Sequence, residues 1–383
     1  MKTNYLHIIS FDIPFPADYG GVMDVFYKLK ALNEAGIKII LHCFQYRDRQ
    51  AQPELEKYCE KVYYYKRNLS LLGILSSLPF IVKSRTSSAL LKNLKNDTYP
   101  ILFEGLHTCG IIDDKILKDR FKIIRMHNVE WEYYRNLEAL ENRIANKIYF
   151  KTESLKLQKF ETYAIKHAQS ILTISPDDED YFKQIFEKEN LNENIINYIP
   201  PFHPNTTVDS KTERGEYVLF HGKLSVPDNE QGAIYLIKKV FSKVDVPFII
   251  AGKDPSVSLI DLAHKYENIT IKANPKEDEM NDLIQNAQIN VLVSFQRSGM
   301  KLKLLNALYR GRFCIANRSM VQNTGLESLC IVKNTSKEIA ATVESYMNLQ
   351  FSNKQINERR AILEQAFSNK INAFKIVEIL PQI

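Results

Sequence analysis

The segment 296–311 reads Gln-Arg-Ser-Gly-Met-Lys-Leu-Lys-Leu-Leu-Asn-Ala-Leu-Tyr-Arg-Gly and closely follows the apolar run 289–294. That run has the length of a buried strand. In the segment after it, Leu304, Leu305 and Leu308 recur at helical spacing on one side. A strand, a turn and a helix in this order indicate an α/β unit.

The turn of this segment also predicts an anion site. Gly299 allows the backbone to approach a ligand closely. Lys301 and Lys303 stand at the start of the predicted helix, where unpaired N–H groups and the helix dipole favour negative charge. An ordinary turn with two solvated lysines is the alternative, and a matching feature near the N-terminus favours a phosphate site.

That matching feature is the segment 11–21, which reads Phe-Asp-Ile-Pro-Phe-Pro-Ala-Asp-Tyr-Gly-Gly and lies between a predicted strand and a predicted helix. Open parallel sheets bind ligands at this position. Gly20 and Gly21 allow a turn whose backbone amides face a phosphate or a hydroxyl. The chain has no G-x-G-x-x-G and no G-x-x-x-x-G-K-[ST] motif, so neither a dinucleotide site nor a nucleotide triphosphatase is indicated.

Strand and helix patterns alternate along the chain, which predicts parallel sheets covered on both faces. The turn-rich stretch 199–216 interrupts the alternation and predicts a linker, and 383 residues make two domains the default. The predicted strands are 5–11, 37–43, 101–103, 122–126, 170–174, 217–221, 247–251, 269–272, 289–294 and 313–317. The predicted helices are 21–35, 142–166, 231–241, 258–266, 280–287 and 370–380.

The composition is that of an ordinary globular protein, with 45% hydrophobic and 25% charged residues. No apolar run reaches the ~20 residues that span a bilayer, and no signal-peptide pattern precedes the first strand, so we expect a cytoplasmic protein. The five cysteines are widely spaced and lack a C-x-x-C pair, which argues against disulfides and zinc. A net charge of +6 that is spread along the chain fits an anionic small ligand or lipid surface better than nucleic acid.

One region interleaves aromatic, apolar and basic residues. It begins with Tyr63-Tyr64-Tyr65-Lys66-Arg67, continues through the apolar segment 71–82, and ends with basic residues at 83, 85, 92 and 95. This pattern fits peripheral contact with the cytoplasmic face of the inner membrane. The other interpretation, which Pro79 and the short length favour, is a core helix with a basic rim.

Six segments together carry a resemblance to a known family. In their order along the chain they resemble bacterial family 4-like glycosyltransferases (glycosyl transferases group 1) with the GT-B fold, over nearly the whole chain. The six segments are Pro14 to Gly21, Arg125 to Trp131, Leu172 to Ser175, Phe220 to Lys223, Phe248 to Lys253 and Gly299 to Gly311.

The resemblance implies two Rossmann-like domains that face each other across a cleft holding the active site. Residues 1–203, completed by a returning helix at about 369–383, would form the acceptor-binding domain, and 204–368 the domain that binds the nucleotide sugar. It implies a metal-independent hexosyltransferase without cofactors, which transfers a sugar with retention from a UDP- or GDP-linked donor. The acceptor would be a glycan or a lipid-linked sugar in surface polysaccharide synthesis.

The resemblance also assigns roles to individual residues. His127 would lie beside the reacting sugar, and Lys223 and Lys303 would stabilise the diphosphate leaving group, which requires basic groups when no metal is used. The expected donor- and phosphate-binding residues are Gly20, Gly21, Gly222, Ser298, Gly299, Lys301 and Asn306. The expected acceptor residues are His107, Asn128 and Glu130.

The chain departs from the family pattern at two positions. Ser298 and Asn306 stand where many members carry two glutamates eight positions apart. An asparagine can hydrogen-bond a ribose hydroxyl, but it carries no charge and cannot act as a base. This departure indicates altered donor recognition, and a catalytically inert paralogue remains an alternative.

Four other interpretations stay open. Asp178-x-Asp180 matches the metal-binding D-x-D motif, although Ser175-Pro176 before it indicates a helix start with acids in its first turn. Glu130, Glu132 and the segment 138–141 supply carboxylates for a glycoside hydrolase, but nothing in the sequence sets the ~5–10 Å separation which that chemistry needs. A nucleotide-sugar epimerase on the same fold and a non-catalytic sugar-nucleotide or glycan-binding subunit complete the set.

Overall fold

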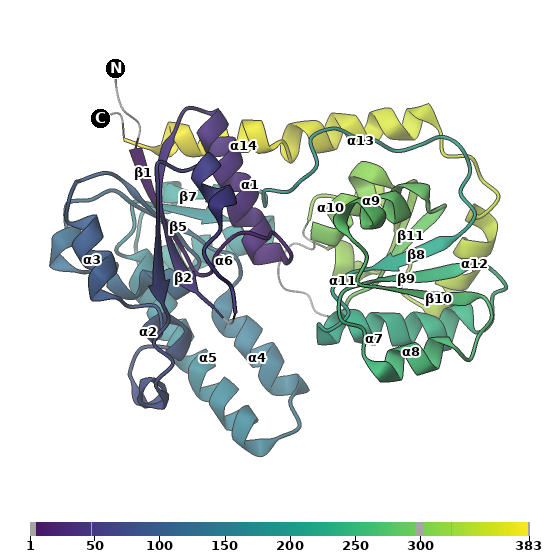
Figure 1. The fold of residues 1–383 in the computed structure, drawn as a ribbon, viewed down its shortest axis with the longest axis horizontal. Helices are drawn as coiled ribbons and strands as arrows, with labels where there is room; N and C mark the ends of the chain where they lie inside the picture. The colour runs from purple at the N-terminus through teal and green to yellow at the C-terminus, as the bar shows by residue number, and fades with distance from the viewer. Residues whose placement is uncertain (1–4, 47, 296–301, 323, 382–383) are drawn as a thin grey trace. The chain divides into compact units, whose positions relative to one another are not determined.

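The computed structural model describes residues 5–46, 48–295, 302–322 and 324–381. They form two compact units (Figure 1). Unit 1 runs to Pro204 and resumes at Phe367, and unit 2 runs from Asn205 to Ala366. Among the described residues, no helix is long and apolar enough to cross a membrane.

Unit 1 is built on a parallel sheet with the strand order β3-β2-β1-β4-β5-β6-β7. Its inner strands are almost wholly buried, as the predicted two-sided cover requires. The order changes direction between β1 and β4, and such a switch point is where open parallel sheets bind ligands. The strands are β1 (Tyr5–Ser10), β2 (Lys38–Gln45), β3 (Lys61–Lys66), β4 (Ile101–Glu104), β5 (Lys122–Arg125), β6 (Ser170–Thr173) and β7 (Ile196–Tyr198).

Helices cover both faces of this sheet. On one face α1 and α14 pack against a core that includes Val25, Leu29 and Ile376, and Figure 1 shows these two helices beside each other. On the other face α3, α5 and α6 contribute Leu90, Leu157 and Phe182 to a second core. The helices of unit 1 are α1 (Gly20–Glu34), α2 (Phe80–Lys83), α3 (Ser88–Leu94), α4 (Glu130–Leu140), α5 (Ile144–Ile165), α6 (Pro176–Lys188) and α14 (Asn369–Ile379).

Unit 2 repeats this architecture with the strand order β10-β9-β8-β11-β12-β13, again parallel. The order changes direction between β8 and β11. The strands are β8 (Val218–His221), β9 (Phe248–Gly252), β10 (Ile269–Ala273), β11 (Ile289–Leu292), β12 (Phe313–Ala316) and β13 (Ile331–Val332).

The helices of unit 2 connect these strands. In α10 the predicted apolar side is buried, with Leu304, Leu305 and Leu308 inaccessible to solvent. α7 begins at Pro227, four residues before the predicted start, and continues as the π-helix η6 (Ile237–Phe241). The helices are α7 (Pro227–Leu236), α8 (Val257–Ala263), α9 (Glu277–Asn286), α10 (Leu302–Arg310), α11 (Arg318–Val321), α12 (Ser336–Tyr346) and α13 (Asn353–Ala366).

The segment between the two sheets has no helix or strand from Ile199 to Tyr217, as the linker prediction requires. Each end of it is fastened to its own unit. The Phe202 N–H donates to Oδ1 of Asp24 at 2.7 Å in unit 1, and the Asp209 N–H donates to the Tyr309 carbonyl at 2.7 Å in unit 2.

The region predicted to be either an interfacial segment or a core helix with a basic rim forms neither as one piece. Its start, Lys61–Lys66, is the edge strand β3. Its apolar part is divided between the short 3-10 helix η2 (Leu71–Leu75) and α2, because Pro79 stands directly before α2. Ile81 and Val82 are buried, whereas the Leu75 side chain is 83% exposed.

Candidate active site

The carboxyl ends of β1, β4 and β5 bring three rings together at the switch point of unit 1. The Phe11 ring lies 5.4 Å from the His107 ring and 5.3 Å from the His127 ring, centroid to centroid. Each of these residues follows a strand by one to three positions. Two of the predicted site residues, His107 and His127, are therefore neighbours although 20 positions separate them in the sequence.

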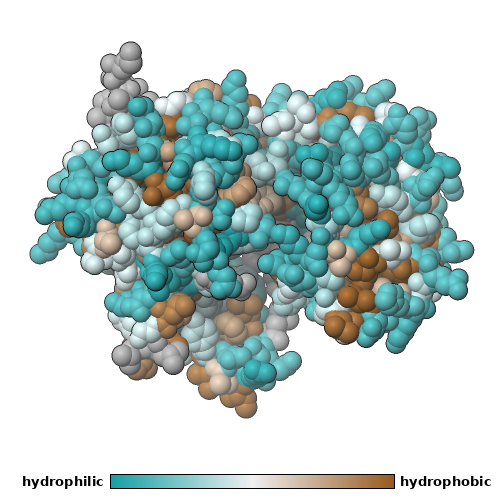
Figure 2. Space-filling model, in the orientation of Figure 1, coloured by the Kyte–Doolittle hydropathy of each residue, from teal (hydrophilic) through white to brown (hydrophobic). Residues whose placement is uncertain are grey.

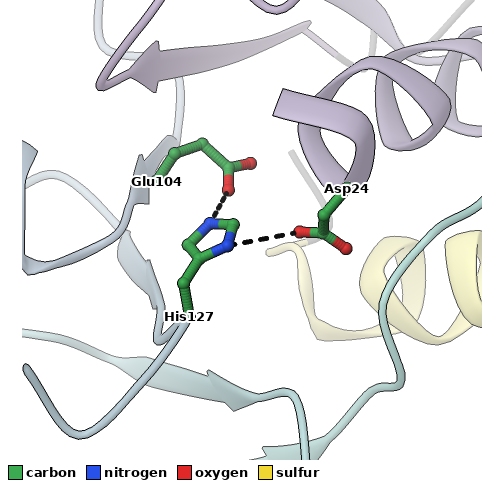
Figure 3. Close-up of side chains that lie close together, drawn as sticks. All are labelled: Asp24, Glu104 and His127. Atoms are coloured by element: carbon green, nitrogen blue, oxygen red, sulfur yellow. Dashed lines mark hydrogen bonds and ion pairs between the residues drawn. The ribbon is translucent and has the colours of Figure 1, made fainter. Parts of the chain in front are cut away.

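His127 joins a buried charge network (Figure 3). Its Nε2 lies 2.9 Å from Oε2 of Glu104, and its Nδ1 lies 3.9 Å from Oδ2 of Asp24. Lys28 Nζ bonds to Asp24 at 2.8 Å and to Glu104 at 2.9 Å. Arg125 Nη2 bonds to Oδ1 of Asp24 at 3.0 Å. A histidine held by a carboxylate has a fixed ring orientation, which a group acting on a substrate requires.

The electrostatics of this network keep both acids ionised. Burial by itself would raise the pKa of Asp24, but the charges of Arg125 and Lys28 outweigh it and hold that pKa below its ordinary value. The pKa of Glu104 is likewise raised by burial and lowered more strongly by Lys28 and by the hydrogen bond from His127. Asp24, Lys28, Glu104 and Arg125 were not identified from the sequence. The signal that could have found them is the presence of charged residues where apolar ones are expected, on the buried side of α1 and within the buried strands β4 and β5.

Ligand atoms of Asp24, Glu104 and His127 lie within 4.8 Å of one another, a spacing that fits a metal ion. The ammonium of Lys28, however, already lies between the two carboxylates. Two acids, Lys28 and Arg125 balance to zero charge when His127 is neutral. A divalent ion would add two uncompensated buried charges, which is costly, so this group fits an internal ion-pair network better than a metal site.

The other predicted acceptor residues lie next to this network. His107 Nδ1 is 3.8 Å from Oε1 of Glu130, and burial, followed by the nearby charge of Arg85, holds the pKa of His107 well below its ordinary value. Burial raises the pKa of Glu130 to about 7, against the hydrogen bond from the Asn128 side chain. The structure thus brings His107, Asn128 and Glu130 together, with a neutral His107 imidazole and a Glu130 carboxyl that is partly protonated near pH 7.

Gly20 and Gly21 are the first two residues of α1. The N-cap residue, Tyr19, makes no side-chain capping hydrogen bond, and no acid lies in the first turn, so the N-terminal N–H groups keep the ability to face an anion. A Cβ on Gly21 would lie 2.8 Å from the Phe11 ring. The need for glycine at Gly21 therefore comes from the packing of that ring.

In unit 2 Asn229 joins the side chain of Lys303 to the backbone of Lys223, two of the predicted site residues. Lys303 Nζ donates to Oδ1 of Asn229 at 2.7 Å, and Nδ2 of Asn229 donates to the Lys223 carbonyl at 2.9 Å. Lys303 also lies 5.1 Å from the centroid of the Phe220 ring. The loop after β8, the start of α7 and the start of α10 are thereby joined at the switch point of the second sheet.

The loop after β8 depends on a close approach between two strand ends. Gly222 follows β8, and a Cβ on Gly252 at the end of β9 would lie only 1.8 Å from the Gly222 carbonyl oxygen. Only glycine at position 252 leaves room for that carbonyl. Beside the loop, burial and then the charge of Lys303 lower the pKa of His221 to about 3, so this imidazole is neutral.

Asp228 fastens the start of α7 to the end of β11. Its carboxylate accepts from Ser294 Oγ at 2.7 Å and from the Phe295 N–H at 2.8 Å. Neither Asp228 nor Asn229 was identified from the sequence. The signal was Pro227-Asp228-Asn229-Glu230, which has a proline followed by acids as helix starts do, but the predicted helix began too late to include it.

The remaining predicted donor residues have different positions. Oδ1 of Asn306 accepts from Nδ2 of Asn205 at 2.8 Å, so in this structure its amide oxygen is occupied by the linker. Ser298, Gly299 and Lys301 lie outside the described residues.

The helix-cap interpretation of Asp178-x-Asp180 is confirmed. α6 begins at Pro176, Ser175 is its N-cap, and the Ser175 side chain accepts from the Asp178 N–H. Asp178 is buried, whereas Asp180 is exposed, so the two carboxylates do not share one accessible site.

Comparison with known proteins agrees with this architecture. Residues 215–348 match the family model described as glycosyl transferases group 1. A relative from Klebsiella pneumoniae, an uncharacterised 44.6 kDa protein in the cps region, is 28% identical and aligns with 91% of this chain and 97% of its own length.

Solved structures resemble the fold over nearly the whole chain. Anabaena HepE in complex with UDP and glucose is 12% identical with a TM-score of 0.63, and 98% of each chain is covered. TarM from S. aureus, in complex with Fondaparinux, alpha-GlcNAc-glycerol and UDP, is 11% identical with a TM-score of 0.66 and 99% coverage of each chain. The lipopolysaccharide outer core galactosyltransferase WaaB is 12% identical with a TM-score of 0.62, with 97% of this chain and 99% of that chain covered. The predicted GT-B fold with two Rossmann-like domains is thus confirmed.

Proposed function

The chain belongs to the group 1 glycosyltransferases, and on this premise we propose that it transfers a hexose from a UDP- or GDP-linked donor to a glycan or lipid-linked acceptor, with retention. The cps-region relative supports a role in surface polysaccharide synthesis. A cytoplasmic location, expected from the sequence, is part of the same proposal.

The observation that carries the proposal is that Asn229 joins the Lys303 ammonium to the backbone of the loop that carries Lys223. The departing nucleoside diphosphate gains negative charge as the sugar leaves, and fixed cations with helix N-termini stabilise such charge. Lys303 stands at the start of α10, and Lys223 follows β8. We therefore assign diphosphate binding to unit 2, with Gly222 as part of the same loop, and with Ser298, Gly299, Lys301 and Asn306 as further donor contacts.

We assign the acceptor to unit 1, at the carboxyl ends of β4 and β5. We assign contact with the reacting sugar to His127. The bond from its Nε2 to Glu104 holds the ring in one orientation. His107 and Asn128 supply neutral hydrogen-bonding groups for sugar hydroxyls. Burial raises the pKa of Glu130 to about 7, so its carboxyl is partly protonated near pH 7 and can then donate as well as accept. Gly20 and Gly21, the first residues of α1, keep their assignment to the donor phosphate.

Metal independence follows from the same assignment. Lys223 and Lys303 provide the positive charge that a divalent ion supplies in other transferases. Asp178 has a structural explanation in the first turn of α6, and Lys28 already neutralises the one cluster of acids and histidine that has metal-like spacing among the described residues.

The proposal is tested by incubating the purified full chain with UDP- and GDP-linked hexoses without acceptor, and by a thermal-shift screen over UDP, GDP, ADP and CMP. A transferase slowly hydrolyses its donor, an epimerase converts the sugar, and a non-catalytic binding protein leaves it intact. The correct nucleoside diphosphate at ~100 times its dissociation constant should add ~2.7 kcal/mol to the free energy of unfolding. Conversion of the sugar without hydrolysis, or no stabilisation by any nucleotide, would refute the proposal.

A further inference from the structure

Helix α5 carries an exposed stripe of alternating apolar and basic side chains. Ile144, Ile148 and Leu155 are 76%, 59% and 55% exposed, and Lys147 and Lys151 between them are also exposed. These five residues, the α5 stripe, are spaced by three, four, seven and eleven positions from Ile144. Such spacing places all of them on one side of a helix.

Basic residues predominate among the charges around the stripe. Between Asn142 and Phe160 the exposed charged residues are Arg143, Lys147, Lys151 and Lys159, whereas Glu141, directly before this stretch, accepts from the Asn146 side chain at 2.9 Å. The acid in this stretch, Glu153, is buried and bonds to Lys156 at 2.9 Å. The outer side of α5 therefore presents positive charge and aliphatic surface together.

A second segment extends the apolar surface. Lys156 Nζ donates to the Ile74 carbonyl at 2.7 Å, and Glu153 accepts from the Phe80 N–H at 2.5 Å, so α5 holds the chain between η2 and α2. Leu75, next to Ile74, is 83% exposed. Figure 2 shows hydrophobic surface gathered at the lower end of the molecule, where Figure 1 shows the α4–α5 hairpin.

We propose that the α5 stripe and Leu75 dock on a bilayer surface that contains anionic phospholipid. Helices that lie in a membrane interface combine aliphatic anchors with lysines, whose stems lie along the apolar surface while their ammonium groups reach the headgroups. The cores of protein–protein interfaces are depleted of lysine, which makes a protein partner a poorer match. The proposed membrane contact therefore lies mainly on α5, and Leu75 is its one residue from the segment 63–95 in which the sequence predicted it.

This proposal rests on the proposed function only in that a lipid-linked acceptor would be reached at the same surface. Its test needs neither donor nor acceptor. The full chain is sedimented with vesicles of phosphatidylcholine alone, and with vesicles of equal parts phosphatidylcholine and phosphatidylglycerol. Binding should occur to the anionic vesicles and should weaken as salt is added, because exposed charges are screened.

Variants locate the contact. Ile148→Glu removes one aliphatic anchor, and Lys147→Glu with Lys151→Glu reverses two charges, so each variant should lower the partition coefficient by about 10-fold or more. The matched controls lie in unit 2. Val257→Glu replaces a residue that is 73% exposed on α8, and Lys238→Glu with Lys239→Glu reverses two exposed lysines. The controls should bind as the wild type does, and all variants should keep its melting temperature because every site is exposed.

Equal binding to both kinds of vesicle, or stripe variants that bind like the wild type, would overturn the proposal. A concentration-dependent oligomer that Ile148→Glu dissociates, without vesicle binding, would show instead that the stripe joins copies of this chain. Nucleotide stabilisation and donor hydrolysis are measured without vesicles. If the protein binds vesicles but shows neither nucleotide stabilisation nor donor hydrolysis, the proposed function is refuted and the membrane proposal stands. If it shows both but does not bind vesicles, the membrane proposal is refuted and the proposed function stands.

Discussion

Lys303 donates a 2.7 Å hydrogen bond to the amide oxygen of Asn229, 74 positions earlier in the chain. The amide nitrogen of Asn229 donates in turn to the Lys223 carbonyl. One asparagine therefore fixes a lysine side chain from α10 and the loop after β8. Such fixation reduces the ordering cost when an anion binds.

Changing Lys303 to Ala should weaken binding of the correct nucleoside diphosphate by ~10- to 100-fold, because a charge-assisted hydrogen bond contributes ~1.5–3 kcal/mol. Binding of the nucleoside itself should change little. Isothermal calorimetry on both ligands measures the difference, and Lys223→Ala should behave in the same way. Lys238→Ala, an exposed lysine of the same unit, is the control, and equal losses for nucleoside and diphosphate would remove both lysines from the phosphate site.

Asn229→Ala should also weaken diphosphate binding, by less than Lys303→Ala does, since it frees the lysine without removing its charge. In the double variant the two effects should not add, with a coupling energy of about 0.5–3 kcal/mol, as expected for residues in direct contact. A double-mutant cycle on the diphosphate dissociation constant provides the measurement. Strict additivity would mean that Asn229 does not position Lys303.

His127→Ala should lower turnover by about 10-fold or more while nucleotide affinity stays nearly unchanged, the signature of an interaction made mainly in the transition state. Steady-state kinetics with the acceptor and nucleotide binding are measured on the same preparation.

His127→Gln is the matched control for stability, because its amide can still donate to Glu104. This variant should keep the wild-type melting temperature and still lose turnover. Full turnover in His127→Ala would make His127 a structural histidine.

Glu161→Gln should make the protein more stable at alkaline pH. Glu161 is fully buried and accepts from the Tyr181 hydroxyl at 2.8 Å, and burial raises its pKa from 4.5 to about 8. Between these values the folded protein binds more protons than the unfolded chain, so the free energy of unfolding falls as pH rises through this window.

The glutamine variant removes this titration and keeps an acceptor for Tyr181. The free energy of unfolding is measured with urea for both proteins near pH 4 and near pH 8.5. The difference, variant minus wild type, should be larger near pH 8.5 by at least about 1 kcal/mol. A pH-independent difference would show that Glu161 is ionised in the folded protein.

Removal of metals should leave activity intact. Donor hydrolysis in EDTA should equal that in Mg²⁺ or Mn²⁺, because lysines are assigned the role of the cation. Asp180→Ala should lower the free energy of unfolding by ~1 kcal/mol or less, since the residue is exposed and lies just beyond the first turn of α6, where the helix dipole has little effect. A strict requirement for a divalent ion, or loss of turnover in Asp180→Ala, would show that Asp178-x-Asp180 does more than begin a helix.

The sequence by itself determined the two α/β units, because the spacing of apolar residues along each segment shows which side of the helix or strand is buried. The apolar run 289–294 and the side of α10 that carries Leu304, Leu305 and Leu308 are examples, as is the N-cap of α6 at Ser175. The resemblance of its motifs to the family also led to the prediction that Lys223, Lys303 and His127 are site residues. Short edge strands such as β7 and β13 were not predicted, because two or three residues show no periodicity.

Only the tertiary structure decided which side chains meet. The network of Asp24, Lys28, Glu104, Arg125 and His127 joins one helix to two strands, and Asn229 joins the two lysines of unit 2. Their partners are up to 101 positions apart in the chain, so no local pattern records the pairing. The folding of parallel strands brings their carboxyl ends to one edge, and it is this long-range convergence that turns scattered polar residues into a site.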